Sequence, residues 1–361
     1  MGLQLRLYWM QWIIMAQEGK MGAHEKSNDN KSKSKGTRAL IIVVCVLVGL
    51  ALLLGGTVLV LSVLGRQALT DDGTDINLPD AEAGVVRHDG KSYKYNEDMV
   101  CILLMGVDGS RPEQDGKFGY ANQSDVNMLA ALDMKNNKIT LISISRDSMC
   151  EMDVLDENGE RTGTTTAQLA LAHSFGDGGA VSCELTEDAV SRLFYDLPIS
   201  AYASIYMDGV LQLINDLGGV TVTIDEPVLG YAQGQQVTLY GKSAESFLRY
   251  RESTVDGNNG RMQRQRQVML ALMYAALDRV RQDPASIVTI YNSISDSVTT
   301  DIGITEMTYL ATKAGKMSFD GEIRNVAGES VLGEYNHAEY NVDKDALYDL
   351  ILDVFYEPVE S

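Results

Sequence analysis

The sequence predicts an α/β fold, in which an αβα sandwich with a mixed β-sheet covered by helices on both faces is preceded by one transmembrane helix. The first observation is that residues 39–64 contain no charged side chain. The second is a continuous apolar run at residues 99–108, MVCILLMGVD, which is typical of a strand buried on both faces. The third is the alternation of strand-like and helix-like segments beyond residue 91, which favours a sheet with helices on both sides.

The apolar segment 39–64 predicts a transmembrane helix, because about 26 residues rising 1.5 Å each exceed the ~30 Å hydrocarbon core of a bilayer. A cleaved signal peptide is the alternative, but its apolar region is only ~7–15 residues long. Residues 1–38 carry seven basic and three acidic side chains, which predicts a cytoplasmic tail by the positive-inside rule. We therefore expect a single-pass protein of the cell membrane whose large domain lies outside the cytoplasm.

The charge distribution restricts the partners of this large domain. The formal net charge of the chain is −20 and residues 1–38 contribute +4, so residues 39–361 carry −24. Such acidity excludes nucleic acid as a partner, since nucleic-acid binding depends on basic patches that neutralise phosphates. Residues 65–90 are acidic and Gly-rich without apolar periodicity, which predicts an extracellular spacer.

The folded part is expected to comprise one large domain over residues 91–282 and a C-terminal extension, residues 283–361, packed on or following it. VNMLAALDM and KITLISISR, residues 126–134 and 138–146, flank the turn KNN and predict a β-hairpin. The other expected elements are helices over 186–197 and 208–219, strands over 220–224 and 236–240, and a long helix over 260–284.

Three cysteines follow the apolar segment. Cys101 lies in the buried run and is expected to be a small hydrophobic residue of the core. Cys150 and Cys183 lie in polar contexts, on the side of a membrane where disulfides persist. We predict a bond between them, with free thiols as the open alternative, because the sequence does not show that their Cα atoms come within reach.

Five arginines gather in LRYRESTVDGNNGRMQRQRQ, residues 248–267 of this acidic chain. If the helix starts near residue 260, Arg261, Arg264 and Gln265 share a face, whereas Arg266 leaves the helix about 140° away and is expected on the surface. The guanidinium fork matches phosphate oxygens two at a time, and helix N-termini attract anions. The pattern indicates a phosphate site; the alternative is a set of surface ion pairs.

At this point the motifs resemble those of the LytR-CpsA-Psr family of membrane-anchored enzymes. The segments that carry the resemblance are MGVDGSR (105–111), QSDVNMLAALDMKNNKITLISISRD (123–147), LINDLGGVTV (213–222), and RYR followed by GRMQRQ (249–251 and 260–265). The resemblance implies Mg²⁺-dependent transfer of a glycopolymer from an undecaprenyl-diphosphate-linked donor to a peptidoglycan acceptor, with release of undecaprenyl phosphate. The glycopolymer would be teichoic acid, capsule or a secondary wall polysaccharide.

The resemblance also implies roles for particular residues. Asp108 and Asp125 would hold Mg²⁺, and Asp125 is a candidate base, with Arg146 and Arg261 as further catalytic residues. The residues expected to bind the pyrophosphate are Arg146, Arg249, Arg251, Arg261, Arg264, Gln265 and Gln123. Gln123 stands where the family usually has arginine, and Ser145 where it has proline, which suggests a divergent subgroup.

Two other functions remain open from the sequence. One is a non-catalytic envelope module or regulator that binds polyprenyl phosphates, and the other is a polyprenyl pyrophosphatase that uses water as the acceptor. Retention of both aspartates and of the arginines favours the enzyme. His173 is expected to be a packing or turn residue, because no Ser-His or Cys-His arrangement stands out in the sequence.

Overall fold

The computed structural model describes residues 57–70, 78, 81–82, 84–109, 117–251, 257–283, 285–333 and 337–359. The described residues from Val58 onward belong to one compact unit. The expected cytoplasmic tail, 1–38, and most of the expected span, 39–64, lie outside the described residues, although positions 57–64 begin a described helix, 57–70. Within the described ranges, no helix combines the length and apolarity that crossing a bilayer requires.

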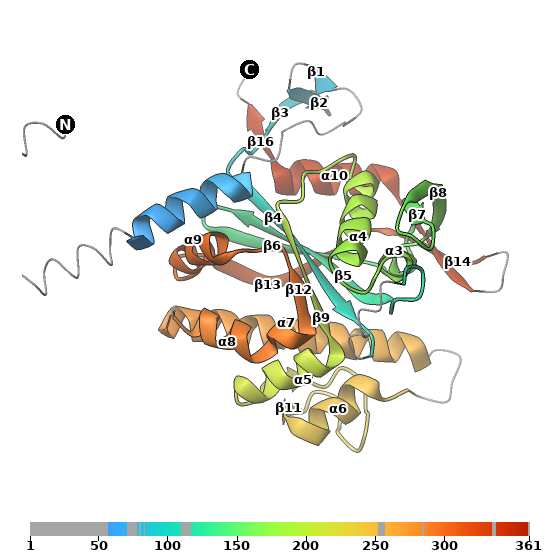
Figure 1. Cartoon of the computed structure of the whole chain (residues 1–361), viewed down its shortest axis with the longest axis vertical. Coiled ribbons are helices and arrows are strands. Elements are labelled where there is room, and N and C mark those ends of the chain that lie inside the picture. The colour runs from blue at the N-terminus through green and yellow to red at the C-terminus, as the bar shows by residue number, and fades with distance from the viewer. Residues whose placement is uncertain are drawn as a thin grey trace, which may run out of the picture. The chain divides into compact units, whose positions relative to one another are not determined.

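A six-stranded mixed sheet forms the centre of this unit (Figure 1). Its strand order is β12 (Val298–Thr300), β9 (Ala201–Tyr206), β4 (Met99–Val107), β5 (Ser124–Asp133), β6 (Lys138–Ile144) and β13 (Ser318–Asn325). Strand β4 pairs antiparallel with β5 and parallel with β9, while β6 pairs antiparallel with β5 and parallel with β13. The predicted buried strand and the predicted hairpin are both confirmed.

Strand β4 shows why this sheet is covered on both faces. Successive side chains of a strand point to opposite faces, so an uninterrupted apolar run needs two cores. Cys101 and Leu103 enter one core, whereas Val100 and Ile102 enter the other. The αβα arrangement predicted from the sequence follows from this pattern.

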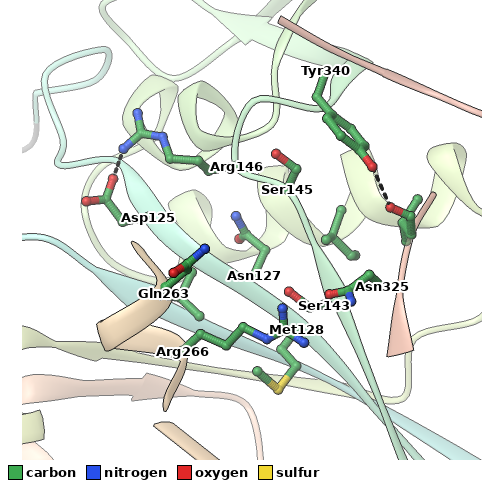
Figure 2. A pocket seen from close by; sticks show the side chains of 13 residues that line it. Asp125, Asn127, Met128, Ser143, Ser145, Arg146, Gln263, Arg266, Asn325 and Tyr340 are labelled. Carbon is green, nitrogen blue, oxygen red and sulfur yellow. Dashed lines mark hydrogen bonds and ion pairs between the residues drawn. The ribbon is translucent and has the colours of Figure 1, made fainter. Parts of the chain in front are cut away.

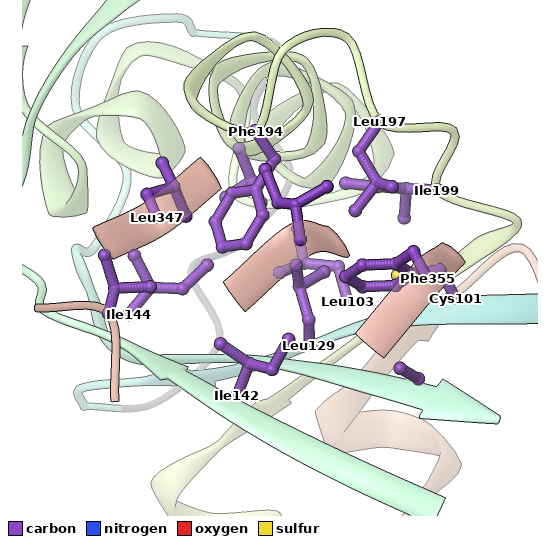
Figure 3. Packing of buried hydrophobic residues seen from close by; sticks show 14 of the residues in the cluster. Cys101, Leu103, Leu129, Ile142, Ile144, Phe194, Leu197, Ile199, Leu347 and Phe355 are labelled. Atoms are coloured by element: carbon purple, nitrogen blue, oxygen red, sulfur yellow. The ribbon is translucent and has the colours of Figure 1, made fainter. Parts of the chain in front are cut away.

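The first core is covered by α3 (Ala170–Phe175), α4 (Ala180–Leu193) and α10 (Lys344–Phe355). Phe194, Leu347 and Phe355 pack there onto Leu103 and Leu129 of the sheet (Figure 3). The second core is covered by helix 57–70, α7 (Gly257–Gln282) and α9 (Ile304–Ala314), and α8 (Ser286–Ile294) contacts α7.

A third core lies under α7, where α5 (Met207–Asp216), α6 (Gly241–Arg249), β10 (Val220–Thr223) and β11 (Gln236–Leu239) pack on Val268 and Leu272. Gly218 and Gly219, which link α5 to β10, both have positive φ. A Cβ on Gly219 would come within 2.9 Å of Thr238, so glycine is needed here for conformation and for space.

The segment beyond residue 282 completes the central sheet, because β12 and β13 form its two edges and α10 contributes to the first core. The expected spacer, 65–90, also contains folded residues. The remaining elements are β1 (Ala81–Glu82), β2 (Val85–His88), β3 (Lys91–Tyr95) and β16 (Tyr356–Val359) in one sheet, the pairs β7 (Met149–Leu155) with β8 (Arg161–Gln168) and β14 (Gly328–Leu332) with β15 (Ala338–Val342), and the 3₁₀ turn η1 (Ser295–Ser297).

The predicted disulfide is wrong. Cys150 and Cys183 are both free and buried in the first core, and the Cys183 thiol lies 3.3 Å from the hydroxyl of Ser204. Cys150 and Cys183 face the core from β7 and α4, and polar neighbours such as Ser148 and Ser182 are buried beside them. Burial raises the pKa of each of these two thiols to about 12.

We predict that Cys101, Cys150 and Cys183 resist maleimide labelling at pH 7 in the native protein, because the reactive thiolate is scarce and shielded. After unfolding without a reductant, all three should be labelled, together with Cys45 of the apolar segment 39–64. Mass spectrometry of the labelled chain counts them. A mass showing that Cys150 and Cys183 stay unmodified in denaturant would restore the disulfide.

Candidate active site at the ends of β4 and β5

Asp108 lies directly after β4, where open α/β sheets present ligand-binding residues. Its side chain is half-exposed, and the backbone N–H of Gly109 donates to its Oδ1 at 2.9 Å. The side-chain amide of Asn122 donates to the Asp108 carbonyl at 2.7 Å. Gly109 has a φ of 81°, and a Cβ there would meet that amide at 2.8 Å, so the turn that places Asp108 requires glycine.

Asp125 is placed by a β-bulge. Gly106 pairs with Val126 and Val107 pairs with Ser124, so Asp125 is the extra residue of β5. Bulges re-aim side chains and are frequent beside active sites. The Asp125 side chain is only 5% exposed, and it therefore needs charged partners.

Two arginines supply those partners. Arg146, just after β6, forms an ion pair with Asp125 Oδ1 (Figure 2), and Arg261 on α7 donates from Nη2 to Asp125 Oδ2 at 3.0 Å. The other terminal nitrogen of Arg261, Nη1, lies 3.6 Å from Asp108 Oδ2. Three segments that are distant in the sequence thus meet at one buried carboxylate, and Arg261 connects the two aspartates.

Two buried polar atoms at this place have no hydrogen-bond partner among the described residues. They are Nε of Arg261 and Oε1 of Gln265, whose residues are 5% and 4% exposed. A small, mostly apolar cavity of about 20 Å³ adjoins Asp108, Asp125 and Gln265. Buried polar groups are normally paired, so these two atoms mark a polar centre that the described side chains leave incomplete.

The electrostatics of Asp125 point the same way. Burial raises the pKa of the Asp125 carboxyl above its ordinary value, and Asp108 adds to this rise. Arg146 and Arg261 lower the pKa, as does Arg251, but they do not outweigh the desolvation. Asp125 is therefore a carboxylate that an additional cation would stabilise.

The Mg²⁺ prediction can be compared with this donor set. Among the described residues, no group of three or more His, Cys, Asp or Glu side chains could hold a metal ion. Asp108 and Asp125 supply two carboxylates on either side of one guanidinium. One or two carboxylates completed by substrate phosphates is the usual protein environment of Mg²⁺, so the residues fit the ion with a phosphate-bearing substrate present.

Other predicted binders are more dispersed. The side-chain Oε1 of Gln123 accepts a hydrogen bond from the guanidinium of Arg146. Arg251 is exposed and close enough to Asp125 to influence its pKa. Arg249 is the last residue of α6 and lies 3.6 Å from Glu245 and 3.9 Å from Asp208.

Arg264 differs from its expected role. Its guanidinium donates to the carbonyl of Phe247 at 3.1 Å and to that of Tyr250, and it lies over both aromatic rings. These contacts bind the last turn of α6 to α7. Arginine at a helix C-terminus satisfies carbonyls that lack intrahelical partners, which explains this placement.

We predict that Arg264→Ala lowers the free energy of unfolding by about 1–3 kcal/mol, since two carbonyls lose a charged donor and two rings lose a cation. Urea denaturation followed by circular dichroism measures the change. Arg279→Ala, an exposed arginine near the end of the same helix, is the control and should cost less than about 0.5 kcal/mol. Equal stability of the two variants would contradict the structural role of Arg264.

Arg266 was expected on the surface, and this expectation is wrong. Its side chain is half-buried, and it lines a cavity with Asp125 and Arg146 (Figure 2). Helix α7 packs on both sides, so a residue that leaves the Arg261 face still enters the protein.

His173 is fully buried and its Nδ1 lies 2.7 Å from the Asn122 carbonyl, while burial lowers its pKa, in agreement with a packing residue.

The mixed sheet, with carboxylates and arginines converging beyond β4 and β5, defines an α/β protein with a charged candidate site at the ends of these two strands. A model of the LytR_cpsA_psr family matches residues 70–350. The chain belongs to this family, and the resemblance seen in its motifs is confirmed.

Relatives and solved structures agree with this membership. The protein named polyisoprenyl-teichoic acid–peptidoglycan teichoic acid transferase TagU in Oceanobacillus iheyensis is 31% identical, over 74% of this chain and 78% of that protein. The protein of the same name in Enterococcus faecalis is 28% identical, over 60% of this chain and 66% of that protein. The crystal structure of Bacillus subtilis TagV matches with a TM-score of 0.54 at 25% identity, over 70% of this chain and 94% of that one. TagT bound to LI-WTA shares the fold, with a TM-score of 0.50 at 17% identity.

Proposed function

We propose that the protein is a phosphotransferase that moves a glycopolymer from an undecaprenyl-diphosphate-linked donor to peptidoglycan. The observation that carries the proposal is Arg261, a buried guanidinium between Asp108 and Asp125 with an orphaned Nε donor, beside Arg146. Such an arrangement suits a diphosphate better than a single carboxylate, because several fixed donors face one place. The transferase names of the TagU relatives support the substrate class.

The reaction needs positioning and charge stabilisation more than a protein nucleophile. An acceptor hydroxyl of peptidoglycan attacks the phosphorus next to the glycan. The bond from that phosphorus to the bridging oxygen breaks, and undecaprenyl phosphate leaves with the bonding electrons. Arg146, Arg251 and Arg261 would stabilise the charge on the phosphate oxygens, with Gln123 and Gln265 as neutral partners, and Asp125 is the candidate to receive the hydroxyl proton.

Mg²⁺ is part of the proposal, with Asp108 and Asp125 as its protein ligands. When bound, it would neutralise charge on the two phosphates. We further propose that residues 39–64 anchor the chain in the cell membrane and that the domain lies outside the cytoplasm. The uncharged stretch behind a basic tail supports this topology.

The test incubates the full chain, purified in detergent, with Mg²⁺, a polyprenyl-diphosphate-linked disaccharide donor and peptidoglycan. The donor carries a label on its sugar. We expect the labelled sugar phosphate to become attached to peptidoglycan while polyprenyl phosphate is released in equal amount. Release of polyprenyl phosphate without attachment would indicate a pyrophosphatase. Donor binding with no product of either kind would indicate a binding module, and both of these results would overturn the transferase.

A further inference from the structure

Helix 57–70 carries the end of the uncharged segment 39–64 into the folded unit. Its second half is fixed to the domain, because Leu69 is 2% exposed in the second core and Arg66 forms an ion pair of 2.8 Å with Asp98. Its first half exposes large apolar side chains, which are those of Val58, Leu59, Val60, Val63 and Leu64. The last residues of the predicted membrane segment are therefore part of the folded domain.

Helix α9 lies against helix 57–70 (Figure 1). The hydroxyl oxygens of Ser62 and Thr312 are 3.4 Å apart. A Cβ on Gly65 would come within 2.1 Å of the carbonyl oxygen of Thr305, so glycine is what lets the two helices approach so closely. Helix α9 is thus held beside residues of the predicted membrane segment.

An apolar cavity of about 830 Å³, here called the α8–α9 groove, is lined by Val58 and by residues of and beside α8 and α9. None of the described residues that line it is charged, although the chain carries a net charge of −20. Two of them, Ile304 and Val288, are 76% and 56% exposed. Exposed apolar side chains gathered at one place on a protein mark a site of interaction with a partner or a membrane.

The chain itself indicates what covers the α8–α9 groove. About 20 residues are enough to cross the hydrocarbon core of a bilayer, so the last residues of the longer segment 39–64 are expected at the level of the lipid headgroups. Val58 belongs to this segment and also lines the groove. A bilayer that holds the segment therefore reaches the groove as well.

Basic side chains lie at the end of α9. Lys313 is in the last turn of the helix, and Lys316 is exposed just after it. Gly315, which lies between them in the sequence, lines the α8–α9 groove. Lysines at the border of an apolar face are typical of surfaces that lie in the headgroup region of a membrane, where they attract anionic lipids.

We propose that residues 57–64, α8 and α9 form a face that lies in the surface of the bilayer, with phospholipid acyl chains in the α8–α9 groove and both lysines at the lipid phosphates. The proposal rests on the membrane anchor in residues 39–64 that the proposed function includes. It goes beyond that anchor, because it fixes which side of the folded domain meets the membrane.

This orientation places the candidate active site away from the lipid. Asp98, the partner of Arg66, directly precedes β4, whereas Asp108 directly follows this strand. The nine residues of β4 rise about 30 Å. The candidate active site therefore lies on the side from which an acceptor outside the membrane approaches.

The experiment uses the full chain reconstituted in vesicles of phosphatidylcholine and phosphatidylglycerol, with and without bromine on the acyl chains, because bromine quenches tryptophan fluorescence at short range. Ile304→Trp and Val288→Trp each place a tryptophan at an exposed position of the groove. Leu332→Trp is the matched control, since Leu332 is 72% exposed on β14, far from α9 in Figure 1. The natural Trp9 and Trp12 contribute equally to all variants, so the wild-type signal is subtracted.

An interfacial apolar face is buried about 5–10 Å into the boundary between headgroups and acyl chains, so we expect brominated lipid to lower the added fluorescence of both groove variants by about half. The fluorescence of Leu332→Trp should stay nearly unchanged. Both groove positions are exposed, so either variant suffices if the other does not fold, as judged by circular dichroism.

Three results would overturn this membrane face. The first is quenching of the control equal to that of the groove variants, and the second is the absence of quenching in groove variants that float with the vesicles. The third is recovery of fluorescence on addition of farnesyl diphosphate, which would assign the groove to the hydrocarbon tail of the donor. Absence of quenching together with cross-linking between copies would identify a second copy of the chain as the occupant.

Failure of the proposed function would look different. If residues 39–64 did not anchor the chain, wild type would not float with the vesicles after a wash at high salt, and the membrane face would fall with the anchor. If the anchor held but the protein were not a transferase, the quenching would be unaffected, because the measurement involves neither donor nor acceptor turnover.

Discussion

Arg261→Ala is expected to lower the rate of glycopolymer transfer about a hundredfold to a thousandfold. Arg261 is 5% exposed and is the residue that contacts both Asp108 and Asp125. Its removal takes away a preorganised donor where charge develops, and losses of this size follow when such donors are deleted. It also leaves two carboxylates facing each other beside the phosphates, which disfavours binding of any anion.

Arg261→Lys refines this prediction, because lysine keeps the charge but cannot contact two carboxylates with a planar fork. We expect its rate to lie between those of wild type and Arg261→Ala. Arg279→Ala, exposed on the same helix, is the control and should retain full activity. The measurement is initial transfer rate at saturating peptidoglycan, with circular dichroism to verify folding. A wild-type rate for folded Arg261→Ala would remove this residue from the active site.

Phe355→Ala is expected to lower the free energy of unfolding by about 3–5 kcal/mol. Phe355 ends α10, is fully buried, and packs in the first core with Leu103 and Leu129 (Figure 3). Truncation removes the ring and leaves a cavity among residues from the centre of the sheet, which cannot easily collapse. The loss would be a large part of the stability of a typical domain.

Leu332→Ala is the control for this change, because Leu332 is also beyond residue 282 but is 72% exposed. It should cost less than about 0.5 kcal/mol. Unfolding in guanidinium chloride, followed by far-ultraviolet circular dichroism, measures the free energy of unfolding of both variants. A small effect of Phe355→Ala would mean that residues beyond 282 contribute little to the core, contrary to the packing described above.

The elements predicted correctly are those whose signal is local. Strand β4, the β5–β6 hairpin and α7 each consist of a long apolar or periodic run, so sequence neighbours suffice to identify them. The roles of β12 and β13 depend on pairing with strands distant in the sequence. No local pattern at Val298–Thr300 or Ser318–Asn325 specifies that pairing, so the sequence alone does not show that these residues form the edges of the sheet.

The candidate site shows the same division. The motifs point to Asp108, Asp125, Arg146 and Arg261, and the structure brings all four together. The bulge that turns Asp125 inward is a matter of register, which the sequence does not reveal. Helical periodicity predicts only the direction in which a side chain leaves the helix, not what it contacts. It therefore does not show that Arg264 donates to carbonyls of α6 or that Arg266 lines a cavity.

Titration of the detergent-solubilised full chain with farnesyl diphosphate and farnesyl monophosphate, with and without Mg²⁺, tests most directly whether this site binds a diphosphate. We predict that wild type binds the diphosphate at least tenfold more tightly than the monophosphate, a difference of about 1.4 kcal/mol. Arg261→Ala should lose this preference and Arg279→Ala should keep it. Equal affinity of wild type for the two lipids, or a preference that survives in Arg261→Ala, would contradict the central claim.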